Sequence, residues 1–333
     1  MLAEREREVA LEATVRERLE LIEAALLRAA EADSAMVTEA ARHVIAAGGK
    51  RFRPLLVVLA SQFGPAGDPA GAPAEDVVRA ALVVELTHVA SLYHDDVMDE
   101  ARLRRGSASA NERWGNTVAI LVGDFLFARA SEEVAELGPD YVRLQARTFA
   151  RLVQGQIAET VGPQDADPLA HYLQVVADKT ASLIATSALF GAKVAGAELS
   201  VQRALAAYAE EIGTVFQLSD DVIDVTSDET GKTPGTDLRE GIPTLPTLLF
   251  RRSADPSSPA DSRLLQLLDS DLSDDADLAE ALGLLRVHHC VDEARAEVRR
   301  RADRARSFLA DLPAGPARDA LADLCDSVVT RSV

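Results

Sequence analysis

The chain has few of the residues that build disulfide-bonded or membrane-spanning proteins. Its 333 residues include two cysteines, Cys290 and Cys325, which are too few for a disulfide framework and lack the paired spacing of a metal site. No run of about 18 uncharged apolar residues occurs, and the opening stretch MLAEREREVALEATVRERLE lacks the apolar segment of a signal peptide. We therefore expect two ordinary buried thiols and a cytoplasmic protein.

Aromatic residues and positive net charge are also scarce. With 4% aromatic and 47% hydrophobic residues, and many Ala, Leu, Glu and Arg, the composition favours helix over sheet and predicts an all-α protein. The formal net charge of −19 argues against a nucleic-acid partner, which calls for a basic face. An anionic substrate would need a local cluster of Arg and Lys, with metal ions, to overcome this charge.

Apolar residues recur at spacings of three and four through most of the chain, for example from Val77 to Asp99, which predicts long helices. Stretches rich in Pro, Gly, Asp or Ser interrupt the pattern at residues 64–74, 162–168 and 253–262, where we expect surface loops. None of them resembles an interdomain linker. We therefore expect a single domain over residues 1–333, a length that could also bury two smaller cores.

Two acidic clusters of identical spacing stand at the ends of apolar helical runs, in SLYHDDVMDE and FQLSDDVIDV. Their members are Asp95, Asp96, Asp99, Asp220, Asp221 and Asp224. On a helix the first and last aspartates of a cluster share a face and repel each other by about 0.2–0.5 kcal/mol unless a cation is present. One such cluster is typical of a solvated helix end, but two copies indicate a site. Facing each other across a helical bundle, they would form an oxygen-rich site that suits magnesium.

Basic residues lie beside both clusters in sequence. GGKRFRP, LRRGS, ADKTASL and DETGKTPGTD supply Lys50, Arg51, Arg53, Arg104, Arg105, Lys179, Thr180 and Lys232. Neighbouring arginines can form bidentate hydrogen bonds to phosphate oxygens through their guanidinium groups. Each charge alone is typical of a solvated surface, but their positions favour a diphosphate site. The GKT at residues 231–233 is no Walker A loop, because Thr226 stands where the first glycine would be needed.

Taken together, GGKRFRP, LYHDDVMDE, LRRGSASANERWGN, GDFLFARA, DKTASL, FQLSDDVIDV and GKTPGTDLREGIPTLP resemble the trans-isoprenyl diphosphate synthases of the polyprenyl synthetase family. The likeness is greatest to the long-chain enzymes of actinobacteria, and the motifs span residues 48–248 in the family's order. The resemblance implies a single all-α bundle around a central cavity, usually a homodimer. It also implies head-to-tail condensation of isopentenyl diphosphate with an allylic diphosphate, using magnesium, for isoprenoid or quinone side-chain biosynthesis.

The resemblance also implies roles for individual residues. Asp95 and Asp99, assisted by Asp96, would hold two magnesium ions on the allylic diphosphate, and Asp220 with Asp224 would hold a third; Mn²⁺ is a possible substitute. Isopentenyl diphosphate would be bound by Lys50, Arg53, His88 and Arg105, and the allylic diphosphate by Arg104, Lys179 and Lys232. Gln217 and Thr180 would lie close to the developing cation. The catalytic set is then Asp95, Asp96, Asp99, Arg104, Lys179, Asp220, Asp221 and Asp224.

The implied chemistry matches these residue types. Breaking the allylic C–O bond moves negative charge onto the leaving diphosphate, which metal ions, Arg and Lys stabilise. No general base is assigned, since proton removal in this family is credited to the departing diphosphate. His88 has an even alternative as a satisfied core histidine. His288 and His289, beside Cys290, lie in a charged helical stretch without a second ligand pair, and we interpret them as ordinary residues.

Two positions bear on substrate and product. Ile242 stands where family members often have lysine, so one phosphate contact is missing and Lys232 would carry more of that load. Upstream of the first motif, Ala90 and Ser91 are small where short-chain enzymes commonly place an aromatic residue. One helical turn advances about 5.4 Å, roughly one five-carbon unit, so a blocking residue deeper than this level would admit longer chains. We expect a product longer than about fifteen carbons.

Two alternatives remain. A class I terpene cyclase shares the bundle and one DDxxD motif, but it needs neither GGKRFRP nor the second motif with Asp224. A non-catalytic subunit of a heteromeric synthase would keep the fold without turnover, although such subunits tend to lose an acidic motif. The product is hydrophobic and could bring the protein to a membrane surface, so we expect at most peripheral membrane contact.

Overall fold

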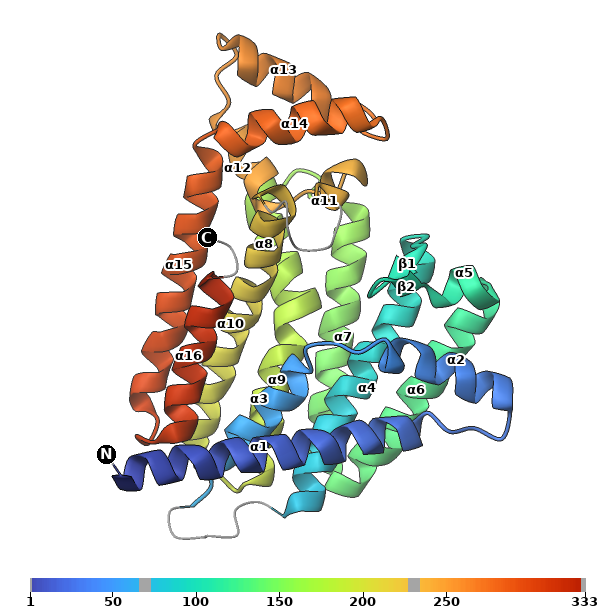
Figure 1. Cartoon of the computed structure of the whole chain (residues 1–333), viewed down its shortest axis with the longest axis vertical. Coiled ribbons are helices and arrows are strands. Elements are labelled where there is room, and N and C mark those ends of the chain that lie inside the picture. The colour runs from blue at the N-terminus through green and yellow to red at the C-terminus, as the bar shows by residue number, and fades with distance from the viewer. Residues whose placement is uncertain (1, 66–72, 227–233, 331–333) are drawn as a thin grey trace. The chain divides into compact units, whose positions relative to one another are not determined.

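Helices form almost all of the regular structure, which confirms the all-α prediction. The computed structural model describes residues 2–65, 73–226 and 234–330, so Lys232 and its predicted role lie outside the described residues. The chain divides into two compact units, which are described in turn; Figure 1 labels their helices and strands. The first unit comprises Met1–Ala150, Leu183–Ala209 and Asp311–Leu321, and the second comprises Arg151–Ser182, Glu210–Ala310 and Ala322–Val333.

Each unit is built from helices of very different length. The elements of the first unit are α1 (Leu2–Ala29), α2 (Ala35–Ala46), α3 (Phe52–Ala60), η1 (Ser61–Phe63), α4 (Ala74–Met98), β1 (Leu103–Arg104), β2 (Ser107–Ala108), α5 (Ala110–Trp114) and α6 (Asn116–Leu137). Those of the second unit are α8 (Pro168–Val175), η2 (Val176–Ala181), α11 (Thr236–Arg239), α12 (Leu245–Ser253), α13 (Pro259–Leu268), α14 (Asp275–Val287) and α15 (Cys290–Phe308). Elements that contribute residues to both are α7 (Pro139–Val161), α9 (Ser182–Val194), α10 (Leu199–Thr226), η3 (Leu309–Asp311) and α16 (Pro316–Thr330).

Helix α4 is the central element of the first unit. The apolar run that predicts a long helix from Val77 onward is almost entirely buried, and the helix ends at Met98, as expected. It packs closely on α6, because Gly123 has no side chain to collide with the ring of His94. The hydroxyl of Tyr93 donates a hydrogen bond to the Ala40 carbonyl of α2. These contacts fix the end of α4 against two neighbouring helices.

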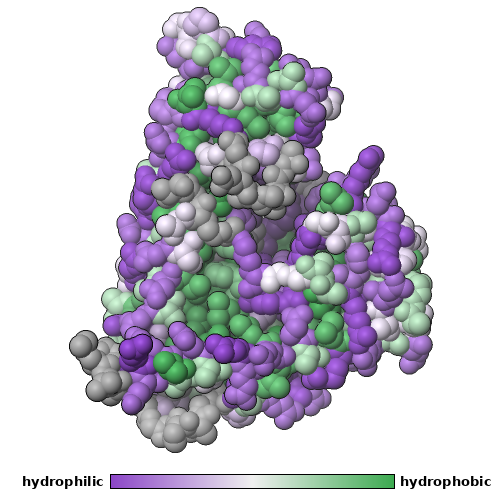
Figure 2. Space-filling view, viewed as in Figure 1, coloured by the Kyte–Doolittle hydropathy of each residue, from purple (hydrophilic) through white to green (hydrophobic). Residues whose placement is uncertain are grey.

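The outer helix α1 contrasts with this buried core. Its first described side chains are exposed and mostly charged, and Figure 2 shows a mainly hydrophilic surface along it. Among the described helices, none is both long and apolar enough to cross a membrane.

Two of the predicted loops are shorter than expected, because a helix cap falls inside each stretch. Asp167 caps α8, accepting a hydrogen bond from the N–H of Ala170, and Pro168 occupies the first turn. Ser258 likewise accepts from the N–H of Asp261, so α13 already begins at Pro259. The remaining predicted loop, residues 64–74, includes residues 66–72, which lie outside the described residues.

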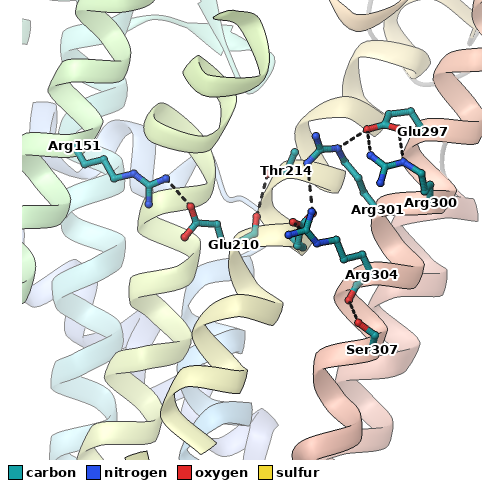
Figure 3. Close-up of polar contacts among 9 residues, drawn as sticks. Arg151, Glu210, Thr214, Glu297, Arg300, Arg301, Arg304 and Ser307 are labelled. Atoms are coloured by element: carbon teal, nitrogen blue, oxygen red, sulfur yellow. Dashed lines mark hydrogen bonds and ion pairs between the residues drawn. The ribbon is translucent and has the colours of Figure 1, made fainter. Parts of the chain in front are cut away.

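In the second unit, ion pairs join α10 to the helices on either side of it (Figure 3). Arg151 of α7 pairs with Glu210 at 2.5 Å, and Arg301 and Arg304 of α15 pair with Glu211 at 3.4 and 3.1 Å. The more exposed Arg151–Glu210 pair is worth at most about 1 kcal/mol. The main effect of these ion pairs is to fix α10, whose last turns carry the second acidic motif.

Candidate active site

The first acidic motif lies where α4 ends. Asp95 is in the last turn of the helix, and Asp99 directly follows it and donates its N–H to the Asp95 carbonyl at 2.8 Å. Asp95 is half-buried and Asp99 is exposed, whereas Asp96 is fully buried. The motif therefore divides into two carboxylates at the accessible helix end and one that is enclosed by protein.

Asp96 is held by an arginine from the neighbouring hairpin. Its Oδ1 accepts hydrogen bonds from Arg104, at 2.6 Å from Nε and 2.5 Å from a terminal nitrogen. Its Oδ2 is buried and has no hydrogen-bond partner among the described residues. Burial raises the pKa of Asp96, and the charge of Arg104 opposes that rise. A buried carboxylate oxygen without a donor is compatible with a cation beside it.

The two arginines of the β1–β2 hairpin contact different parts of the first unit: Arg104 binds Asp96, and Arg105 binds backbone carbonyls around α2. Its turn places Arg105 (φ 53°) and Gly106 (φ 78°) in left-handed conformations, as in a tight two-residue hairpin turn. Arg105 donates to the carbonyl of Val44 at 2.9 Å and also to that of Gly48. A side chain at Gly49 would place its Cβ 3.0 Å from this guanidinium. Gly49 of GGKRFRP therefore lets the Arg105 side chain approach the loop closely.

Arg53, His88 and Arg105 form a basic cluster in the first unit. Arg53 Nε is buried without a hydrogen-bond partner among the described residues. Burial lowers the pKa of Arg53 to about 10, and the charge of Arg105 lowers it further while Glu85 opposes the fall. The pKa of His88 lies well below its ordinary 6.5, because of burial first and of the charges of Arg53 and Arg105 next. His88 is therefore a neutral group among cations, in a cluster suited to an anion.

Arg51 braces this cluster, a role that the sequence did not indicate. It adopts a left-handed backbone conformation (φ 46°) at the start of α3. Its guanidinium donates to both carboxylate oxygens of Glu23 at 2.7 and 2.8 Å, to Glu85 at 3.1 Å, and to the Ile45 carbonyl at 2.9 Å. The partners lie 28 and 34 residues away in sequence, so no local pattern could have revealed them. Lys50, the other cation of the motif, is exposed.

In the second unit, Lys179 and Thr180 lie in η2, a six-residue π-helical segment. Such segments inside α-helices occur frequently at functional sites. A Cβ on Gly155 of α7 would lie 2.6 Å from the backbone nitrogen of Lys179, so only glycine permits this approach. Lys179 Nζ forms an ion pair with Glu159, also on α7. Lys179 is thereby held close to the α7 backbone by a partner that carries the opposite charge.

The second acidic motif also has an enclosed middle aspartate. Asp221 is 2% exposed, and its Oδ2 accepts from the N–H of Leu245 at 2.9 Å and from the hydroxyl of Tyr172. Its Oδ1 accepts from Gln217 Nε2 at 3.2 Å. Burial raises the pKa of Asp221 to about 6, and these three donors oppose the rise.

Asp220 and Asp224 flank this residue and are partly accessible. The carboxylate of Asp224 accepts from the N–H groups of Thr236 and Asp237 at 3.2 and 3.3 Å, at the start of α11. Weak, long hydrogen bonds of this kind leave lone pairs on both oxygens.

Three further residues of the second unit were missed by the sequence reasoning: Gln156, Glu159 and Tyr172. Gln156 Oε1 is buried without a hydrogen-bond partner among the described residues. The stretch GQIAE, which places two polar residues three apart behind a glycine on α7, was an available signal for Gln156 and Glu159. Tyr172 precedes DKTASL on an ordinary amphipathic helix, and nothing in the local sequence pairs it with Asp221.

The predicted site residues are thus distributed over the two units. The first unit contains Lys50, Arg53, His88, Ala90, Ser91, Asp95, Asp96, Asp99, Arg104 and Arg105, and the second contains Lys179, Thr180, Gln217, Asp220, Asp221 and Asp224. Ala90 is fully buried, with its carbonyl against Gly123, and Ser91 is buried with its hydroxyl on the His88 carbonyl at 2.8 Å. Cys290 and Cys325 are buried free thiols, as expected.

Within the described part of the chain, no group of three or more His, Cys, Asp or Glu side chains is placed to hold a metal ion by itself. Magnesium is usually held by one or two carboxylates together with waters and substrate phosphates. The donor set at each motif, two accessible carboxylates on one helix end, has this character.

Comparison with known proteins gives concordant results. The polyprenyl synthetase family profile matches residues 34–285. The nonaprenyl diphosphate synthase of Mycobacterium tuberculosis is 47% identical over 304 residues, which cover 90% of this chain and 88% of that protein. Heptaprenyl diphosphate synthase component 2 of Geobacillus stearothermophilus is 36% identical over 312 residues, covering 92% and 93%. A geranylgeranyl pyrophosphate synthase of Corynebacterium glutamicum, solved with calcium and isoprenyl diphosphate, superposes with a TM-score of 0.85 at 41% identity, covering 97% and 98%.

Proposed function

The chain belongs to the polyprenyl synthetase family and is a trans-prenyltransferase, and on that premise we propose how its residues bind two diphosphates and which product they make. The reaction is the condensation of isopentenyl diphosphate with an allylic diphosphate. The proposal rests on the basic cluster of the first unit, where the buried Nε of Arg53 has no hydrogen-bond partner among the described residues and lies beside Arg105 and a neutral His88.

Isopentenyl diphosphate is the anion that fits this basic cluster. Arg53 and Arg105 donate hydrogen bonds to its diphosphate, and neutral His88 donates one N–H to the same group. The flexible side chain of Lys50, which is exposed to solvent, adds a further positive charge. The repulsion between Arg53 and Arg105 is relieved when the anion binds, so the free energy of binding includes that relief. Arg51, which is ion-paired with Glu23 and Glu85, stabilises the conformation of the GGKRFRP loop.

The allylic diphosphate is bound by the carboxylates of Asp95, Asp99, Asp220 and Asp224 through Mg²⁺, for which Mn²⁺ can substitute. When bound, the ions supply positive charge to the diphosphate as its C–O bond breaks. Arg104 and Lys179 donate to the same diphosphate, and Asp96 orients Arg104. Lys232 is assigned here as well, although it lies outside the described residues. Thr180 and Gln217 lie beside the allylic carbon.

We propose that residues 1–333 act as one catalytic domain, in which both acidic motifs bind the allylic diphosphate. Ser91 leaves room for the growing tail beside α4, whereas Ala90 is fully buried in the packing against α6, and the small Ser91 gives a product longer than about fifteen carbons for isoprenoid or quinone side-chain biosynthesis.

The protein acts as a homodimer in the cytoplasm, with at most peripheral membrane contact. Exposed apolar side chains on α6 support a dimer: Ile120 is 43% and Leu121 61% exposed.

A second candidate function is a subunit that needs a partner for turnover. One relative is named as a component of heptaprenyl diphosphate synthase, which favours this alternative over a class I terpene cyclase. The complete pair of acidic motifs supports turnover by the chain alone.

The test is incubation of the purified protein with labelled isopentenyl diphosphate, Mg²⁺ and each allylic primer, followed by sizing of the extracted product. We expect elongation from at least one primer. Arg53→Gln should raise the KM for isopentenyl diphosphate about tenfold or more, because a charge-assisted contact is lost, and leave the KM for the primer unchanged. Absence of product with every primer would contradict the proposal and favour the subunit.

A further inference from the structure

Asp221 lies at a junction of three elements of the second unit. It belongs to α10, and it accepts hydrogen bonds from the hydroxyl of Tyr172 on α8 and from the N–H of Leu245, the first residue of α12. A third hydrogen bond comes from Gln217, one turn earlier on α10. Both carboxylate oxygens are therefore occupied by donors from the protein, and the side chain is 2% exposed.

This environment separates Asp221 from the aspartates beside it. On an α-helix, Asp220 and Asp224 lie one turn apart on nearly the same face, whereas Asp221 is rotated by about 100° from Asp220. Asp220 and Asp224 are partly accessible, while Asp221 faces the packed interior of the unit. A buried carboxylate that accepts hydrogen bonds from three donors can fix the positions of the helices that supply them, here α8, α10 and α12.

Tyr172 is the donor that reaches Asp221 from outside α10 by a side chain. α8 passes directly into η2, so Tyr172 lies seven residues before Lys179 on one continuous helical rod. Lys179 is in turn ion-paired with Glu159 of α7. The hydroxyl of Tyr172 thus connects the segment that carries Lys179 to the helix end that carries Asp220 and Asp224.

We propose that Asp221 is a positioning residue and that Tyr172, through Asp221, sets the orientation of the second acidic motif relative to Lys179. This inference rests on the proposed function, in which Asp220 and Asp224 hold Mg²⁺ on the diphosphate. Tyr172 and Asp221 touch neither ion nor substrate. They hold the carboxylates and the lysine in the geometry that one diphosphate can satisfy, and loss of such support typically lowers metal affinity or activity about 10–100-fold.

The test compares Tyr172→Phe with Tyr208→Phe. Tyr208 is the control, because its buried hydroxyl donates to the Leu321 carbonyl at 2.7 Å in the first unit, about three helical turns before Asp220 on α10. Each variant loses one buried hydroxyl hydrogen bond, so both should lower the melting temperature. The decisive readout is binding, followed as the rise in melting temperature when Mg²⁺ is titrated in the presence of inorganic diphosphate.

For Tyr172→Phe we expect the Mg²⁺ concentration at half-maximal stabilisation to rise about tenfold, and for Tyr208→Phe no change. Asp221→Asn, which keeps the size but replaces one accepting oxygen with an NH₂ donor and so removes the hydrogen bonds to that atom, should shift it at least as far. Equal Mg²⁺ midpoints for the two tyrosine variants and the wild type would overturn the inference.

Product formation by the wild type is measured in parallel. If the wild type binds Mg²⁺ and diphosphate but forms no product, the proposed function fails, while the binding midpoints still decide the role of Tyr172. If the wild type is not stabilised by Mg²⁺ and diphosphate at all, the positioning role is overturned as well.

Discussion

At the scale of single residues, the middle aspartate of each acidic motif differs from its neighbours. Asp96 and Asp221 are both enclosed, and each is held by a side chain from another element, Arg104 or Tyr172. The sequence predicts the six carboxylates and their spacing, but it cannot separate accessible aspartates from enclosed ones. That distinction depends on partners brought by folding, of which Tyr172 and Leu245 are distant in sequence from Asp221.

His88 gives a prediction about stability and pH. Its pKa in the folded protein lies well below 6.5, so below that pH the unfolded chain binds a proton that the folded protein does not. Stability from this group is therefore lost as the pH falls below 6.5, by up to about 1.4 kcal/mol for each pH unit.

The measurement is chemical unfolding of wild type and His88→Asn at pH 7 and pH 5. The wild type should lose more stability between the two values, because asparagine does not titrate. Parallel losses in the two proteins would show that His88 is protonated normally in the folded state.

At the scale of elements, close helix approaches set the positions of the basic residues. The sequence predicts long helices and places their apolar faces, because periodicity is local. It does not predict the π-helical η2 or its contact with α7, since these depend on which helices meet. Gly155 permits that contact because it has no side chain to collide with the backbone of Lys179. This role could not be assigned from the stretch GQIAE alone.

Gly155→Ala should destabilise the protein and reduce activity. Its Cβ would lie 2.6 Å from the nitrogen of Lys179 and 3.0 Å from the carbonyl carbon of Asp178, so α7 and η2 must separate, at a cost of about 1–3 kcal/mol. Gly283→Ala in α14 is the control, because its Cβ would meet nothing within 4 Å.

The control should gain roughly 0.5–1 kcal/mol, since alanine is the better helix former. Unfolding in denaturant measures both changes, and product formation reports the displacement of Lys179. Equal stability of the two alanine variants would mean that the α7–η2 contact is not tight.

The product-length prediction also belongs to an element, the wall formed by α4. Ser91→Phe should shorten the product, because an aromatic ring at this level would block the tail one turn from the acidic motif. Ser91 is preferable to Ala90 for this test, since Ala90 is fully buried against α6 and a ring there would disturb packing. Chromatography of the products checks it, and an active variant with the wild-type chain length would place the wall elsewhere.

At the scale of the whole molecule, family, fold class and chemistry could all be predicted from the sequence, because the motifs keep their order and spacing over residues 48–248. What the sequence could not give is the set of contacts that brace the motifs. The Arg51 pairs with Glu23 and Glu85, and the Tyr172 bond to Asp221, join residues 28 to 49 positions apart. Such pairs arise from tertiary packing and leave no periodic signal.

The central claim is that both acidic helix ends bind one diphosphate through shared magnesium. The most direct measurement is a crystal structure of the protein grown with Mg²⁺ and inorganic diphosphate. We predict ions on a single diphosphate, with ligands from Asp95 and Asp99 on one side and from Asp220 and Asp224 on the other. A structure in which the two motifs face separate regions of solvent, with no diphosphate in contact with both, would contradict the account.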